Sequence, residues 1–259
     1  MDTGSAALIA LAGTGAGAVN AIAGGGSLIT YPALLAVGYP PVIANVTNTI
    51  GSVPGYVGGA LGYRRELSQQ VRRVVIFSAV TAIGAVAGSA LLLAGSEEAF
   101  VAVVPWLILL STLLLAVQPL ISRMAARRRN TDLPTSGRQE RLRWAAAGQL
   151  GVAAYGGYFN AGLGIMILGV LGITMDTEFQ QLNALKSLLS AVAGIVSLVF
   201  FAIFAVVAWP AALVMAGANL AGGWIGAVLG RRIPVNPLRW SIVAIGLVIF
   251  VILWIDNAY

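Results

Sequence analysis

The chain has 259 residues, of which 59% are hydrophobic and only 9% are charged, and its mean hydropathy is +0.90. A soluble domain usually carries about 25% charged residues, so the composition excludes an ordinary soluble fold and is typical of an integral membrane protein. Cysteine and histidine are both absent, which excludes disulfides, thiol nucleophiles and the most common zinc or haem ligands. The net charge is +6, but no base-stacking aromatic residues lie among the cations, so we expect no nucleic-acid partner.

Ten apolar segments follow one another along the chain, separated by short polar or glycine-rich breaks. Segments 27–37 and 163–175 are shorter than the roughly 20 residues that cross the hydrocarbon core. Each follows a glycine cluster, so we predict that 5–37 and 144–175 form broken helical hairpins that enter the membrane without fully crossing it. The ten segments are 5–23, 27–37, 42–62, 74–94, 99–121, 144–161, 163–175, 179–208, 209–230 and 238–255.

The fourteen arginines fall into three short stretches, and the only other cation is Lys186. Arginine clusters between apolar segments follow the positive-inside rule, which places them in the cytoplasm. Counting segments outward from these loops puts both termini outside. We therefore predict a multi-pass membrane protein whose arginine-rich loops are cytoplasmic. The arginine stretches are 64–73, 123–143 and 231–239.

The two halves of the chain match each other at a single gapless offset of 138 residues. Each half holds five segments, an odd number, so the second copy must be inverted relative to the first. Inverted repeats with interrupted helices are typical of secondary transporters, which hold substrate near the membrane midplane. We predict an all-α membrane fold with repeats at 1–121 and 144–259, joined by a basic cytoplasmic linker at 122–143. The matched pairs are Gly24 with Gly162, Gly26 with Gly164, Asn45 with Asn183, Ser52 with Ser190, Gly84 with Gly222, and Gly88 with Gly226.

Lys186 is the strongest single candidate for a functional residue. An ionisable group inside an apolar span is functional by default, because its burial is costly. The alternative is that Lys186 lies near the end of its helix and extends its ammonium to the lipid headgroups. Its repeat mate is Asn48, and residues three apart share a helix face. Each half of the chain therefore presents two polar groups on one helix face: Asn45 and Asn48 in the first half, and Asn183 and Lys186 in the second.

The candidate site favours an anion over a cation. No carboxylate lies within a span away from its ends, whereas a cation site needs anionic or carbonyl oxygens. Both glycine clusters precede a short helix, whose free N–H groups and dipole attract an anion. Alternatively these glycines only permit close helix packing, as we expect for the GxxxG pairs at 84–88 and 222–226. The predicted substrate-binding residues are Lys186, Asn45, Asn48, Thr47, Asn183, Gly24, Gly25, Gly26, Gly162 and Gly164.

The remaining signals leave several alternatives open. The sequence contains no nucleophile–base pair and no phosphate-binding loop, so we expect neither an enzyme nor a cofactor. A passive anion channel and a non-transporting scaffold are the rival functions. The coupling ion is open, because the spans lack acids for a proton relay while a desolvated Lys186 is able to exchange a proton. The oligomeric state is also open, a homodimer included. Four further amides either line a path or bond between helices: Asn20, Gln149, Asn160 and Asn219.

Two stretches carry a family resemblance. The first reads GAVNAIAGGGSLITYPALLAVGYPPVIANVTNTIGSVPGYVGGALGYRREL, and the second reads YGGYFNAGLGIMILGVLGITMDTEFQQLNALKSLLS. With their glycine-rich hairpins, proline-bearing turn and Asn/Thr-rich helix start, they resemble the sulfite exporter TauE/SafE family of probable membrane transporter proteins, over about residues 8–255. The resemblance implies an inner-membrane protein that moves anions such as sulfite, sulfonates or sulfoacetate, generally outward, without a cofactor.

Overall fold

The computed structural model describes residues 1–22, 25–127, 138–175, 177–229 and 235–256, and within these ranges it contains eleven α-helices and no strand. The predicted all-α fold is confirmed. Long apolar runs favour helix in a membrane because a helix satisfies every backbone hydrogen bond within its own segment. Glycine-rich or proline-bearing breaks separate these runs.

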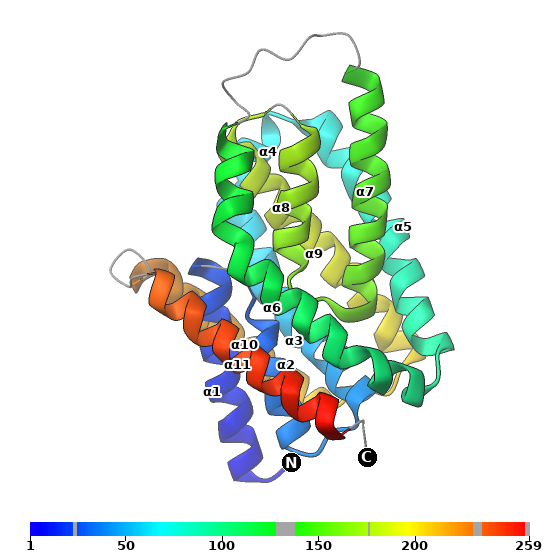
Figure 1. Cartoon of the computed structure of the whole chain (residues 1–259), viewed down its shortest axis with the longest axis vertical. Helices are drawn as coiled ribbons and strands as arrows, with labels where there is room; N and C mark the ends of the chain where they lie inside the picture. The colour runs from blue at the N-terminus through cyan, green and yellow to red at the C-terminus, as the bar shows by residue number, and fades with distance from the viewer. Residues whose placement is uncertain (23–24, 128–137, 176, 230–234, 257–259) are drawn as a thin grey trace.

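Six helices form the first half of the chain. Pro41 opens the third of them, where its missing N–H costs nothing. The last one contains Pro105 and Pro119 and changes direction along its length in Figure 1, because interior prolines kink helices. The helices are α1 (Thr3–Ile22), α2 (Ser27–Ala36), α3 (Pro41–Gly62), α4 (Arg64–Ser68), α5 (Val71–Ala94) and α6 (Glu97–Arg127).

Five helices form the second half, and their bounds agree with the predicted segments to within a few residues at most ends. The short α4 was not predicted. Helix also enters the predicted linker 122–143 from both sides, since α6 continues to Arg127 and the next helix begins at Arg138; residues 128–137 lie outside the described ranges. The helices are α7 (Arg138–Phe159), α8 (Leu163–Thr174), α9 (Phe179–Phe204), α10 (Trp209–Leu229) and α11 (Val235–Asp256).

Helix length separates membrane-spanning from broken elements. By length and composition, α5, α6, α9 and α11 are each able to cross a membrane, and large apolar side chains such as Trp106, Trp240 and Trp254 are exposed on the surface. The helices α2 and α8 have 10 and 12 residues, so they are about 15 and 18 Å long. That is roughly half of the hydrocarbon thickness, and the predicted broken hairpins are present.

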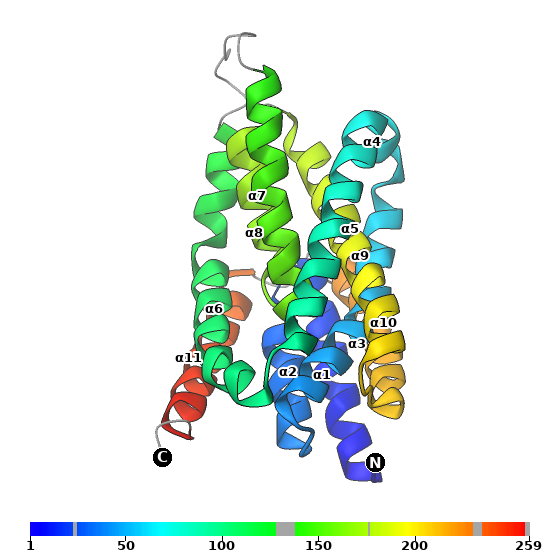
Figure 2. The same cartoon turned by 90° about the vertical axis from the view of Figure 1, so that its right-hand side faces the viewer.

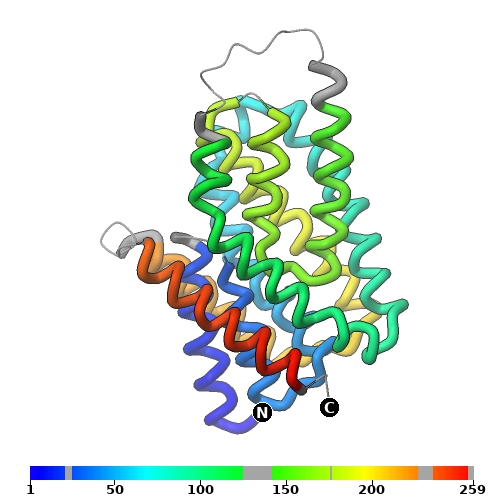
Figure 3. Tube along the Cα trace, viewed as in Figure 1, coloured from blue at the N-terminus to red at the C-terminus, as the bar shows by residue number. Residues whose placement is uncertain are grey.

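Helices α3 and α9 run in opposite directions. In Figure 1, α3 rises from the end that holds both termini to the end at α4, and α9 descends the other way. Both short helices begin near the middle of the molecule and lead toward opposite ends (Figure 3). Figure 2 confirms that the two termini share one end. The end of α10 at Leu229 and the beginning of α11 at Val235 lie about halfway along the long axis rather than at the α4 end.

The predicted GxxxG pairs bring helix backbones into direct contact. A β-carbon at Gly84 of α5 would lie 2.6 Å from the carbonyl oxygen of Leu150 on α7, and one at Gly226 of α10 would lie 2.7 Å from Cα of Ala18 on α1. Only glycine permits such an approach, so the packing role predicted for these pairs is confirmed. Between these two helix pairs α3 and α9 contact each other, α3 also contacts α10, and α9 also contacts α5.

Candidate functional site

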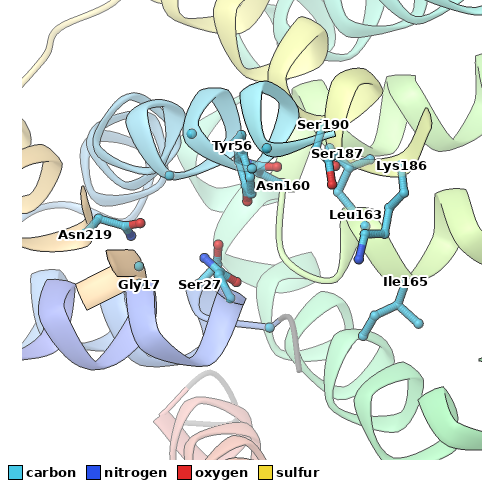
Figure 4. Close-up of a pocket in the computed structure, with 18 of the residues that line it drawn as sticks. Gly17, Ser27, Tyr56, Asn160, Leu163, Ile165, Lys186, Ser187, Ser190 and Asn219 are labelled. Carbon is cyan, nitrogen blue, oxygen red and sulfur yellow. The ribbon is translucent and has the colours of Figure 1, made fainter. Parts of the chain in front are cut away.

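A cavity of about 510 Å³ lies among α3, α9, α10 and the beginnings of the two short helices. Both halves of the chain contribute to its wall, which is shown in Figure 4. Among the described residues that line it, Lys186 is the only charged one and none is acidic. The described wall of the cavity therefore holds one basic group and no acidic group.

One face of α3 forms a wall that is almost free of side chains. Gly55, Gly58, Gly59 and Gly62 all line the cavity, and their spacing of i, i+3, i+4 and i+7 places them on one helix face. Tyr63, the next residue of the chain, continues the wall at the α4 end. The cavity therefore follows α3 from the middle of the helix toward the α4 end of the molecule.

Lys186 reaches the cavity across the beginning of α8. A β-carbon at Gly164 would lie 3.6 Å from Cδ of Lys186 and 3.8 Å from Oγ of Ser190, so the absent side chain leaves room for the lysine stem. In Figure 4 the ammonium nitrogen lies near Leu163. Among the described residues, no hydrogen bond or ion pair engages this ammonium. Lys186 therefore lines the cavity.

The break before α8 adds a second anion-attracting group. Gly162 has φ 75°, a left-handed conformation that glycine adopts at little cost. The amide of Leu163 donates to the carbonyl of Asn160 at 3.3 Å, and the amide of Ile165 donates to the carbonyl of Gly162 at 3.0 Å. The amide of Gly164, which lies between them and lines the cavity, has no partner among the described residues.

The first hairpin is closed by its own residues. The amide of Gly26 donates to Oδ1 of Asn20 at 2.8 Å, and a β-carbon there would lie 2.7 Å from Nδ2 of the same asparagine. Gly26 does not line the cavity, whereas Asn20 and Gly25 do. Gly24 lies outside the described residues. Of the six predicted hairpin and lysine positions, the structure thus brings Gly25, Gly162, Gly164 and Lys186 together.

Asn45 and Asn48 are buried beside the cavity without lining it. Nδ2 of Asn45 donates to the carbonyl oxygen of Tyr158 at 2.8 Å, which joins α3 to α7. The hydroxyl of Thr30 donates to Oδ1 of Asn48, which joins α2 to α3. In this structure both amides therefore connect the broken hairpins to α3.

Thr47 and Asn183 also stand apart from the cavity wall. Oγ1 of Thr47 accepts a hydrogen bond from the backbone amide of Ala208 at 3.3 Å. On α9 the residues that share the cavity with Lys186 are Ser187 and Ser190, which follow it by one and four positions. The signal available in the sequence was Ser190, a small polar residue four positions after the lysine and so on the same helix face.

Besides Asn20, two further amides that the sequence left undecided line the cavity. Asn160 is 1% exposed and Asn219 is 0% exposed, and neither the oxygen nor the nitrogen of either amide has a hydrogen-bond partner. A buried polar group without a partner costs about 1–3 kcal/mol. Such groups persist where a ligand or an ordered water satisfies them, so both amides are candidate binding groups.

The middle of the cavity carries hydroxyl groups. The Tyr56 hydroxyl lies beside the side chains of Ser27 and Asn160 (Figure 4). Gln149, the fourth undecided amide, instead donates to Oγ1 of Thr81 at 2.9 Å and does not line the cavity. The cavity therefore combines one cation, a free backbone N–H and several neutral donors, a set that suits an anion.

The fold and the cavity define an integral membrane protein built around a central, positively charged chamber. A family described as Sulfite exporter TauE/SafE matches residues 9–253 of the chain. The chain belongs to this family.

Curated relatives are similar over shorter stretches, and the chain spans about half of their length or less. A "Probable membrane transporter protein" of Haemophilus influenzae is 30% identical over 149 residues, covering 56% of this chain and 54% of the relative. "Probable membrane transporter protein ORF9" of a Sinorhizobium species is 31% identical over 104 residues, or 40% of each chain. "Probable membrane transporter protein YfcA" of Escherichia coli K12 is 28% identical over 119 residues, covering 46% and 44%. No solved structure matches the chain.

Proposed function

We propose that this protein is a secondary transporter that exports small sulfur-containing or carboxylate anions, such as sulfite or organosulfonates, across the cell inner membrane. The observation that carries the proposal is the Lys186 ammonium in a cavity whose described lining includes no acidic residue. A charge away from bulk water is costly unless it is paired. A bound anion supplies the missing counter-charge.

The anion is held by two groups from the second half of the chain. The Lys186 ammonium provides the charge and the free amide of Gly164, at the beginning of α8, provides a directed donor. Backbone N–H groups at a helix N-terminus are suited to oxyanions. The hydroxyl of Ser190 lines the cavity beside them. Asn45, Asn48 and Thr47 fix the surrounding helices in this arrangement.

Transport proceeds by alternating access between two inverted repeats. Supporting this, α3, α5 and α6 begin at residues 41, 71 and 97, and α9, α10 and α11 begin 138 residues later, at 179, 209 and 235. The contacts are also paired, since α1 packs on α10 as α7 packs on α5, and α3 contacts α10 as α9 contacts α5. The breaks at Gly25 and Gly162 serve as hinges, and the arginine-rich loops face the cytoplasm while both termini lie outside.

A ligand screen of the purified protein tests this proposal. Thermal unfolding is measured with sulfite, sulfate, thiosulfate, sulfoacetate and small carboxylates, because a ligand that binds only the folded state raises its stability. We expect at least one of these anions to raise the unfolding temperature, and sodium or potassium chloride at equal ionic strength to leave it unchanged. Saturable uptake with counterflow in proteoliposomes then identifies a carrier, whereas unsaturated flux identifies the passive channel.

A further inference from the structure

Asn219 of α10 packs closely against two glycines, Gly55 of α3 and Gly17 of α1. A β-carbon at Gly55 of α3 would collide with Oδ1 of Asn219, and one at Gly17 of α1 would collide with its backbone carbonyl oxygen. The surrounding helices therefore approach this residue as closely as backbones allow. Its amide is nevertheless unpaired at both polar atoms and lines the cavity. The packing therefore accommodates the Asn219 side chain but leaves both of its polar atoms without a hydrogen bond.

Asn219 lies at the opposite end of the cavity from Lys186. In Figure 4, Tyr56, Ser27 and Asn160 lie between them. Two glycines of α3 contact residues near the two ends of the cavity. Gly55 faces Asn219, whereas Gly59 faces Ser187, the neighbour of Lys186. Four residues of helix correspond to about 6 Å along the axis. The two contacts on α3 are therefore offset by roughly one helical turn, and the side chains of Lys186 and Asn219 extend away from each other beyond them, with Tyr56 in between.

The volume of the cavity exceeds what a bare oxyanion needs. A water molecule takes up about 30 Å³ in the liquid, so a cavity of about 510 Å³ has room for on the order of 15 of them. An inorganic anion bound at the Lys186 ammonium leaves the Asn219 end to solvent. Only an elongated organic anion is able to occupy both ends.

We propose that the substrate is an elongated organic anion with a second hydrogen-bonding group, which places its acid group at Lys186 and its distal polar group at Asn219. This inference rests on the proposed function and narrows its substrate class. A primary amide both donates and accepts, so it matches a distal hydroxyl or amide. Asn160 and the Tyr56 hydroxyl contact the middle of the molecule.

Paired probes that differ by one hydroxyl test the inference. The first pair is 6-hydroxyhexane-1-sulfonate with hexane-1-sulfonate, and the second pair is 6-hydroxyhexanoate with hexanoate; sulfite is measured beside them. Affinities are determined by calorimetry on the full-length protein in lipid nanodiscs. We expect the hydroxylated member of at least one pair to bind about tenfold more tightly, because a site built for a hydrogen bond penalises a ligand that lacks it.

Three variants test whether Asn219 is responsible for the preference for the hydroxylated anion. Asn219→Leu keeps the approximate shape of the side chain and removes the amide, and Asn219→Ala serves as a second variant of smaller volume. We expect both Asn219 variants to bind the two members of a pair with equal affinity. The member without the hydroxyl should keep the affinity that it has for the wild-type protein. Gln149→Leu, which removes a buried amide outside the cavity, is the matched control and should keep the tenfold preference.

The possible results distinguish a failure of the Asn219 inference from a failure of the proposed function. Equal binding of the paired anions by the wild-type protein, or a preference that survives in both Asn219 variants, would overturn this inference and leave the proposed function standing. If no sulfonate, carboxylate or sulfite binds at all, the proposed function fails and this inference fails with it.

Discussion

The stem of Lys186 lies against Gly164, where a β-carbon would be 3.6 Å from the lysine Cδ. This contact joins α9 to the beginning of α8 and places the only charge of the described cavity wall next to an unpaired backbone amide. Charge and directed donor thus come from two elements of the same half. The other half contributes the glycine face of α3, which keeps the space beside them open.

The repeat-related glycines Gly26 and Gly164 should respond differently to alanine. A β-carbon at Gly26 would lie 2.7 Å from Nδ2 of Asn20, whereas the nearest atom at Gly164 is 3.6 Å away. We expect Gly26→Ala to destabilise the protein by about 1–3 kcal/mol, as overpacking does. Gly164→Ala should be neutral or stabilising by up to about 1 kcal/mol, because alanine is the better helix former. Thermal unfolding in detergent distinguishes these cases, and equal losses would contradict the packing described here.

Replacement of two buried amides, Asn219 and Gln149, by leucine should affect the stability of the protein differently. Asn219 has no partner to lose, so Asn219→Leu is expected to leave the unfolding temperature unchanged or to raise it. Gln149 bonds to Oγ1 of Thr81 at 2.9 Å, and Gln149→Leu should cost about 1–2 kcal/mol because the threonine hydroxyl is left unsatisfied. Thermal unfolding without ligand provides the comparison. A loss at Asn219 as large as that at Gln149 would mean that the Asn219 amide has a structural partner.

The absence of native cysteine allows a direct map of the cavity. Ser190 lines it, whereas Ser197, two turns further along α9, is 0% exposed and lies 3.1 Å from the Ser89 hydroxyl. We expect Ser190→Cys to react with a membrane-impermeant thiol reagent at least about tenfold faster than Ser197→Cys, since thiol reactivity follows access. A bound anion should slow the first reaction only. Intact-mass spectrometry gives the rates, and similar rates at both positions would argue against an open cavity at Ser190.

Much of the fold was predictable because its signals are local. Apolar length and glycine or proline breaks located ten helices, and two segments too short to cross the hydrocarbon gave the broken hairpins. The short α4 (Arg64–Ser68) was missed because it is polar and carries no apolar periodicity. The predicted linker at 122–143 overlaps the end of α6 and the beginning of α7, because these helix ends are polar and give no apolar signal.

The candidate site was harder to predict because lining a cavity depends on helix rotation. Lys186 was found from its charge alone, since one cation in an apolar run is conspicuous. Its partners were sought at Asn183, three residues before it, whereas the cavity face of α9 runs forward to Ser190. The repeat also suggested that Asn48 is equivalent to Lys186, but Asn48 bonds to Thr30, a contact between α2 and α3 that no spacing reveals. Asn219 could be recognised only when the unpaired amide was seen beside Gly55.

The most direct test of the central claim is anion flux by Lys186→Met in proteoliposomes, with Lys186→Arg as the charge-conserving control. Methionine keeps an apolar stem on Gly164 and removes the charge. Loss of one partner of a desolvated charge pair costs about 2–5 kcal/mol, so we expect flux of the anion identified by the ligand screen to fall by roughly 30-fold or more while the unfolding temperature is maintained. Partial flux should remain in Lys186→Arg. Wild-type flux in Lys186→Met would contradict the account, because the cavity would then bind its anion without the lysine.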